Sequence, residues 1–318
     1  MYLQNTQELR PIPEGYKQTF QNKFTSSVAK NEVIKMKNEG TLTDRDLEIS
    51  KFLFKFRFAT LEQIYYYLKE IDCLTQKKAV AGEEVKETSI NSIKSRLDKL
   101  VQNRILNKFM LSLIEEDRIQ QDALCIYCLD LGGKFLLTNY SNEDTTDWYV
   151  TVNLKASEII SKDLFTTQFY LRLLETCGNK IEYFETYPLR KCDKTNIIPS
   201  FEFGLKHNGE VKYFIGEVTR EFDIPIQFSK KVAKLERLLE TNAWRKYYFD
   251  TEAPPVLFAF AENDLMANDI ARIISTSTIE RFRLSTDERI MGDLSTAFMA
   301  YLPEVNKLKL VKSSILSK

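Results

Sequence analysis

The chain has 318 residues, of which 43% are hydrophobic and 28% are charged, a composition typical of folded proteins with room for two domains. Lysine and arginine together number 45, as do aspartate and glutamate, so the net charge neither favours nor excludes a nucleic-acid partner. The single histidine, His207, excludes a metal site built from several histidines. Five cysteines without close spacing, no secretory signal and no apolar run of about 18 residues predict a cytoplasmic protein without a membrane partner.

Three helices are predicted after a polar N-terminal stretch. The first lies in TLTDRDLEISKFLFKF, where Thr43 is a good N-cap and apolar residues recur every three or four positions. The second lies in ATLEQIYYYLKE, where Thr60 and Gln63 form a capping box. The third lies in TSINSIKSRLDKLVQN, with Thr88 or Ser89 as its N-cap.

The third helix is followed by two β-like runs, RILNKFMLSLI and ALCIYCLDL. Polar residues from Asp72 to Glu87 predict a loop between the second and third helices. The helix is expected to bury Ile90, Ile93, Leu97, Leu100 and Val101. Three helices and then a β-hairpin are the order of a winged helix-turn-helix, in which the third helix enters the major groove of DNA.

The outward face of the third helix is the predicted DNA-binding surface. It comprises Asn91, Ser92, Lys94, Ser95, Arg96 and Lys99. Five basic residues lie between Lys94 and Lys108, against the single acid Asp98. Two alternatives stay open, because a charged helix face is often only solvated and because a winged domain can also dimerise or bind another protein.

The second half predicts helices on a mixed sheet, which is an α/β domain. The polar segment NYSNEDTTDW forms a natural boundary before it. The predicted division is an arm over 1–40, a winged helix-turn-helix of α+β class over 41–138, a linker over 139–153 and the α/β domain over 154–318. Asp223 is the expected N-cap of the helix IPIQFSKKVAKLERLLE.

A hairpin in the second domain has a register that can be worked out. Asn208-Gly209 is the favoured two-residue type I′ loop, which pairs His207 with Glu210. The same register sets Ser200 directly opposite Glu217, with Cβ atoms roughly 5 Å apart on one face of the sheet. Glu202 lies on that face as well.

The order of a winged helix, a linker and the motifs IIPSFEF, YFIGEVTREF and KKVAKL resembles the replication-relaxation family over roughly Leu42–Asn263. The resemblance implies a protein encoded on a bacterial plasmid or integrative element. It also implies that the second domain is similar to the PD-(D/E)XK nuclease core. The expected function is that of a DNA-binding accessory protein in replication, mobilisation or their regulation.

The family motif is only partly present. Pro199, Glu217 and Lys231 match it, whereas Ser200 stands in place of an aspartate and Thr219 in place of the last residue of Glu-x-Asp or Glu-x-Lys. Because Mg²⁺ is bound through carboxylate oxygens, one Glu and an uncharged Ser predict an inactive nuclease core that needs no cofactor.

Two other functions stay open at this point. One is a Mg²⁺-dependent endonuclease that uses Glu217, Glu202 and Lys231. The other is a transcriptional repressor of the element's own genes, which would use the same winged domain. Double-stranded DNA is the expected partner in all cases, a replication or mobilisation protein is a second one, and a homodimer is left open.

Overall fold

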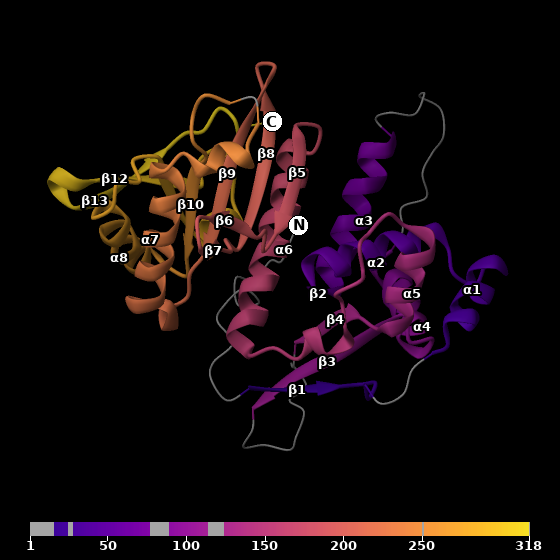
Figure 1. Cartoon of the computed structure of the whole chain (residues 1–318). Helices are drawn as coiled ribbons and strands as arrows, with labels where there is room; N and C mark the ends of the chain where they lie inside the picture. Colours follow the sequence, from indigo (N-terminus) through magenta and orange to yellow (C-terminus); the bar gives the residue numbers. More distant parts are fainter. Residues whose placement is uncertain (1–15, 25–27, 77–88, 114–123, 250, 318) are drawn as a thin grey trace. The chain divides into compact units, whose positions relative to one another are not determined.

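The computed structural model describes residues 16–24, 28–76, 89–113, 124–249 and 251–317 (Figure 1). Two compact units divide between Thr167 and Gln168, within helix α6 (Ser157–Cys177). The expected linker over 139–153 belongs to the first unit, where it holds the end of α5 (Leu131–Tyr140) and the 3-10 turn η2 (Val150–Asn153). Within the described ranges, no helix has the length and apolar character to cross a membrane.

The first unit combines helices with a four-stranded antiparallel sheet of order β1-β3-β4-β2. Its remaining helices are α1 (Lys30–Asn38), α2 (Asp44–Phe56), α3 (Leu61–Gln76) and α4 (Ile90–Gln102). Its strands are β1 (Tyr16–Phe20), β2 (Ala59–Thr60), β3 (Leu106–Leu113) and β4 (Cys125–Leu129). The two predicted β-like runs are therefore confirmed as strands that pair with each other.

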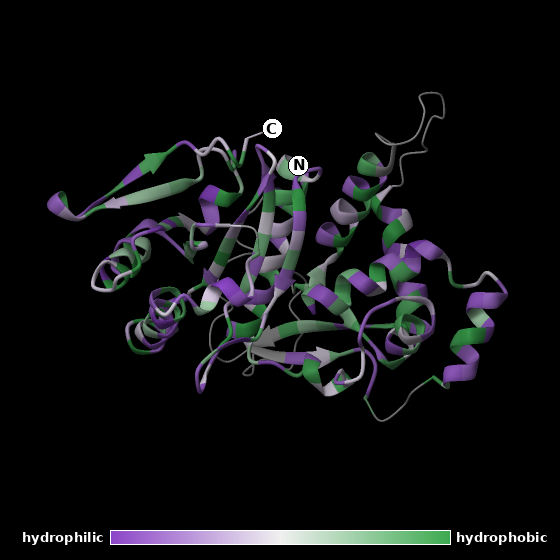
Figure 2. Ribbon diagram, turned by 45° about the horizontal axis from the view of Figure 1, so that its top comes forward, coloured by the Kyte–Doolittle hydropathy of each residue, from purple (hydrophilic) through white to green (hydrophobic). Residues whose placement is uncertain are grey.

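The expected arm over 1–40 is wrong for its described part. Residues 16–20 form β1, which pairs along its whole length with β3. Helix α1 is mostly hydrophilic, as its purple colour in Figure 2 shows, and Val33 is its buried residue. Its apolar residues Val33, Ile34 and Met36 span only about one turn and give no stripe that repeats over several turns, so the hydrophobic pattern could not predict this helix.

Local capping explains where the three predicted helices begin. Thr43 accepts a hydrogen bond from the backbone of Asp46, and Thr60 and Gln63 bond each other reciprocally. Ser89 caps α4 by accepting from the backbone of Ser92. Two expectations are corrected. Helix α3 continues to Gln76, into the expected loop, and the side chain of Ile90 is 36% exposed because it lies in the first turn of α4.

The second unit is built on a seven-stranded mixed sheet of order β13-β12-β11-β10-β9-β8-β5, in which β9, β10 and β11 are parallel. The strands are β5 (Ile181–Thr186), β8 (Phe201–His207), β9 (Glu210–Val218), β10 (Val256–Ala261), β11 (Phe282–Thr286), β12 (Phe298–Leu302) and β13 (Lys307–Val311). A separate two-stranded sheet joins β6 (Arg190–Cys192) to β7 (Thr195–Ile197). The predicted mixed sheet flanked by helices is confirmed.

Helices cover both faces of this sheet. The apolar stripes of α7 (Ile226–Glu240) and α8 (Asp264–Ser275) pack on one face. On the other face, Phe169 of α6 contacts Phe201, Phe203 and Phe260, with ring centroids 4.9 to 5.7 Å apart. Gly216 lies directly beneath Phe201, whose ring would be 2.2 Å from a Cβ atom at that position.

The predicted hairpin register is confirmed. His207 pairs with Glu210 and Phe201 with Gly216, and both loop residues, Asn208 and Gly209, have the positive φ that a type I′ loop requires. The expected cap of the next helix is wrong. Asp223 instead accepts a hydrogen bond from the backbone of Arg220, upstream of it, and α7 begins after Pro225.

Candidate functional site

The hairpin and helix α7 bring three predicted side chains together. Glu217 Oε2 accepts a hydrogen bond from Ser200 Oγ at 3.2 Å and one from Lys231 Nζ at 2.7 Å. Ser200 Oγ also accepts from the backbone N–H of Val218 at 3.0 Å, which fixes the hydroxyl between the two strands. The sequence therefore predicted the positions of Ser200 and Glu217 correctly, and Lys231 does reach them from the helix.

Glu217 and Lys231 form an ion pair whose carboxylate is shielded from solvent. The carboxylate of Glu217 is 2% exposed, and Ser200 and Thr219 are buried beside it. Burial lowers the pKa of Lys231, but the nearby Glu217 and Asp223 raise it by more, so its pKa is above the usual 10.5. Lys231 is thus charged at neutral pH and neutralises Glu217 from the partly solvated side of the pair.

Glu202 does not join this cluster but has partners of its own. Its Oε2 accepts hydrogen bonds from Arg190 Nε and Nη2, at 3.0 and 2.8 Å. The side chain is fully buried, and this burial raises its pKa, although the Tyr248 hydroxyl and Arg190 act in the opposite direction. The sequence placed Glu202 on the correct face, but it could not predict the guanidinium that β6 supplies.

The donor set around Glu217 does not fit a divalent cation. Mg²⁺ needs several oxygen ligands and carboxylate charge, whereas the cluster offers one carboxylate already bonded to an ammonium group. In the described ranges, no group of three or more His, Cys, Asp or Glu side chains could hold a metal ion.

A second charged cluster lies where the parallel strands β9 and β11 end, and no sequence pattern indicated it. Arg220 follows β9, is fully buried, and donates from Nη1 to Asp287 at 3.0 Å, just after β11. Burial raises the pKa of Asp287 to about 6, although Arg220 lowers it in part. Carboxyl ends of parallel strands often carry ligand sites, but here the two charges bond each other.

The predicted DNA-binding face of α4 is exposed at five of its six positions, namely Asn91, Ser92, Lys94, Ser95 and Lys99. Arg96 is the exception. Its Nε donates to Asp46 at 2.7 Å and its Nη2 bonds both Asp46 and the Thr41 carbonyl, which ties α4 to the start of α2. Sequence reasoning missed this structural role, because Asp46 lies 50 residues away.

The region from Lys94 to Lys108 carries less uncompensated positive charge than the sequence indicated. Arg104 pairs with Asp130 at 3.2 Å and Lys108 with Asp98 at 2.7 Å. Together with Arg96, three of the five basic residues are thus neutralised by acids of the same unit. Lys94 and Lys99 remain as exposed cations on α4.

Comparison with known proteins gives only distant structural similarity. No family model matches the sequence, and no curated protein matches it. The chain is similar to protein VC1899 from Vibrio cholerae, with 12% identity and a TM-score of 0.30 over 87% of this chain and 56% of that one. It is similar to the restriction endonuclease FokI, with 12% identity and a TM-score of 0.29 over 78% of this chain and 43% of that one. The chain thus spans about half the length of these solved chains, and membership of the replication-relaxation family stays a prediction.

Proposed function

We propose that this chain is a DNA-binding accessory protein whose second unit has the organisation of a nuclease core without its chemistry. The first unit would bind duplex DNA as a winged helix-turn-helix. Two features support this assignment: the order α2, α3, α4, β3, β4 and the exposed Asn, Ser and Lys side chains on α4. The plasmid or integrative-element setting, and a role in replication or mobilisation, rest on the resemblance of the motifs.

The observation that carries the loss of chemistry is the contact between Lys231 and Glu217. In a metal-dependent nuclease, the divalent cation compensates for the charge of clustered carboxylates and polarises the phosphoryl oxygen. Here Lys231 Nζ, 2.7 Å from Glu217 Oε2, provides that compensation, and Ser200 replaces the second carboxylate. The fold remains useful as a second surface for DNA or for a replication or mobilisation protein.

A gel shift with labelled duplex DNA, at several salt concentrations, tests the proposed binding. The full chain should bind, and Lys99→Ala and Lys94→Ala should each weaken binding and reduce its salt dependence. Lys309→Ala is a matched control, because Lys309 is an exposed lysine of β13, at the sheet edge far from Glu217. Binding by both α4 variants that equals wild type would remove α4 from the interface.

The same preparations should be incubated with plasmid DNA and Mg²⁺ or Mn²⁺ to test the loss of cleavage. Wild type should leave the plasmid intact. Cleavage that disappears in Glu217→Gln would instead establish the endonuclease alternative. A transcriptional repressor would bind upstream of the element's own genes. Footprinting on that DNA distinguishes this from binding at a replication or transfer origin.

A further inference from the structure

A cavity of about 400 Å³ opens in the second unit, on the face of the sheet opposite to Glu217. Its floor consists of Phe214, Phe258 and Phe298, which come from three different strands. Their rings contact each other, with centroids 4.9 Å apart for Phe214 and Phe258 and 4.3 Å apart for Phe258 and Phe298. A packed aromatic floor keeps its shape before any ligand arrives.

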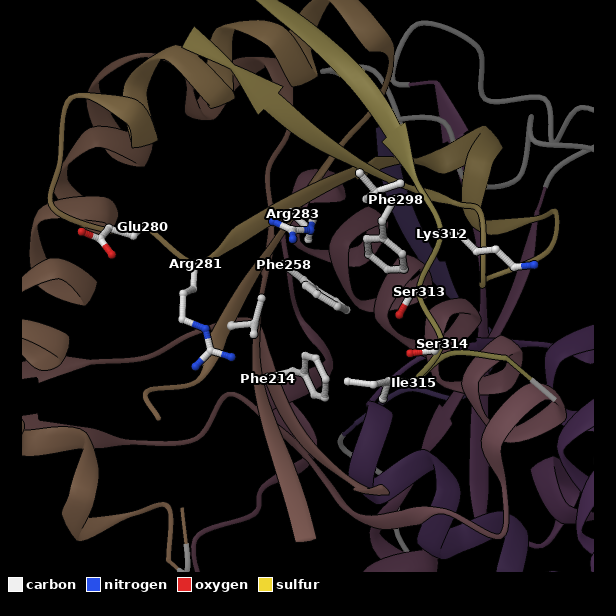
Figure 3. Close-up of a pocket in the computed structure, with 12 residues that line it drawn as sticks. Phe214, Phe258, Glu280, Arg281, Arg283, Phe298, Lys312, Ser313, Ser314 and Ile315 are labelled. Carbon is white, nitrogen blue, oxygen red and sulfur yellow. The ribbon is translucent and has the colours of Figure 1, made fainter. Parts of the chain in front are cut away.

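The wall of the cavity is a short segment after β13 that is held in place at several points. Ser313 N–H donates to the Ser295 carbonyl at 2.7 Å, and Lys180 Nζ donates to the Ser317 carbonyl at 2.8 Å. Ser313, Ser314 and Ile315 line the cavity from this side (Figure 3). The size of the cavity lies in the range of about 300–1,000 Å³ that is usual for small-molecule sites.

The charge of the cavity is positive. Figure 3 shows Arg283 beside the phenylalanine rings and Arg281 next to it, whereas Lys312 and Glu280 point away from the rings. Arg281 Nη1 donates to the Pro254 carbonyl and Arg283 Nη1 to the Phe282 carbonyl, so each guanidinium uses one of its five N–H donors there. Within the described ranges, neither forms an ion pair.

The geometry points to a nucleotide as the ligand of this cavity. Arg281 lies just before β11 and Arg283 lies within it, and both line the cavity, so a single phosphate between them could accept hydrogen bonds from both guanidinium groups. The apolar lining would receive the flat base through the partly exposed side chains of Val256 and Ile315, which cover the buried phenylalanine rings, and the hydroxyls of Ser313 and Ser314 are available to the sugar or the phosphate. This inference goes beyond the proposed function and does not depend on it.

Titration calorimetry with AMP, adenosine, ribose 5-phosphate and inorganic phosphate tests each part of the inference. AMP should bind with saturation. Adenosine and ribose 5-phosphate should each bind at least about tenfold more weakly than AMP, because adenosine lacks the phosphate and ribose 5-phosphate lacks the base. Absence of saturable AMP binding up to about 10 mM would overturn the proposal. Equal binding of AMP and ribose 5-phosphate would overturn the role of the aromatic floor, and with it the nucleotide.

Variants locate the site. Arg283→Ala and Arg281→Ala should each weaken AMP binding about tenfold. Arg272→Ala, which removes an exposed arginine of α8 outside the cavity, should bind AMP as wild type does. Unchanged unfolding temperatures would show that the arginine variants fold. AMP binding that survives both cavity variants would place the ligand elsewhere and refute the proposal.

The nucleotide could be free or could be the 5′ end of a DNA strand, and a competition experiment separates these sources. A 5′-phosphorylated oligothymidylate that displaces AMP about tenfold better than its 5′-hydroxyl form would identify a strand end. Equal competition by the two oligonucleotides would identify a free nucleotide. Neither outcome depends on duplex binding by α4, so a failure here is distinguishable from a failure of the proposed function.

Discussion

Lys231 and Glu217 form an ion pair in which the carboxylate is 2% exposed and the ammonium side chain 37% exposed. Lys231→Ala should therefore leave a buried charge bonded only to a serine hydroxyl. We expect a loss of about 2 kcal/mol in unfolding free energy, less than for a fully buried pair because Lys231 is partly solvated. Urea unfolding followed by circular dichroism measures it, with Lys230→Ala as the exposed control.

The double variant Glu217→Gln with Lys231→Met should recover most of this loss, because it removes both charges together. The pKa of Lys231 lies above its usual 10.5, so the stabilisation is complete below that pH and is lost only as pH rises through the higher folded value. A Lys231→Ala variant as stable as wild type at pH 7 would contradict the importance of the pair.

Ser200→Asp should create a divalent-cation site. The present hydroxyl lies 3.2 Å from Glu217 Oε2, so a carboxylate there would add the second negative charge that Mn²⁺ requires. We expect millimolar Mn²⁺ to raise the unfolding temperature of Ser200→Asp by a few degrees and that of wild type by less. Ser200→Asn, of the same shape but uncharged, is the control, and an equal response of the two variants would refute the prediction. Thr219→Lys is unsuitable, because position 219 is buried.

Arg96→Ala and Lys99→Ala should behave differently although both remove a cation from α4. Arg96 holds Asp46, which is 1% exposed, so its loss should lower the stability of the first unit by about 3 kcal/mol. Lys99 is exposed, and Lys99→Ala should change stability by less than about 0.5 kcal/mol while weakening binding to DNA. Thermal unfolding with gel shifts compares the two. Equal unfolding temperatures would mean that the Arg96–Asp46 contact contributes nothing measurable.

Asp287 should make the second unit more stable in mild acid. Its pKa rises from 3.8 unfolded to about 6 folded, so the folded state binds the extra proton between these values and stability falls as pH rises through that window. Relative to Asp287→Asn, which cannot ionise, wild type should lose about 3 kcal/mol in total as the pH rises from well below 3.8 to well above 6. Chemical unfolding at several pH values measures the difference. A gain with rising pH would show that the attraction of Arg220 exceeds the cost of burial.

The features that could be predicted depend on residues that are close together in the sequence. Thr43, Thr60 and Ser89 cap helices through residues three positions away, and the Asn208-Gly209 loop fixes the register of β8 and β9. Such contacts depend on spacing alone, so a single sequence contains them. The same reasoning placed Ser200 opposite Glu217.

Contacts between distant segments could not be predicted in this way. Asp46 lies 50 residues from Arg96, and Arg220 lies 67 residues from Asp287. An isolated sequence shows two charged residues in each case but not that they meet. The cavity above Phe258 is a stronger example, because its floor combines residues of β9, β10 and β12, and β11 lies between the last two strands.

Gly216 limits how a metal site could be built beside Glu217. Because the ring of Phe201 fills the space where a Cβ atom would lie, any side chain at this position would force that buried ring, on the strand that aligns Ser200 with Glu217, to move. Substitutions of Gly216 are therefore not expected to help build a metal site. A library that aims to build a metal site should keep Gly216 and Phe201 constant and vary positions 200 and 231.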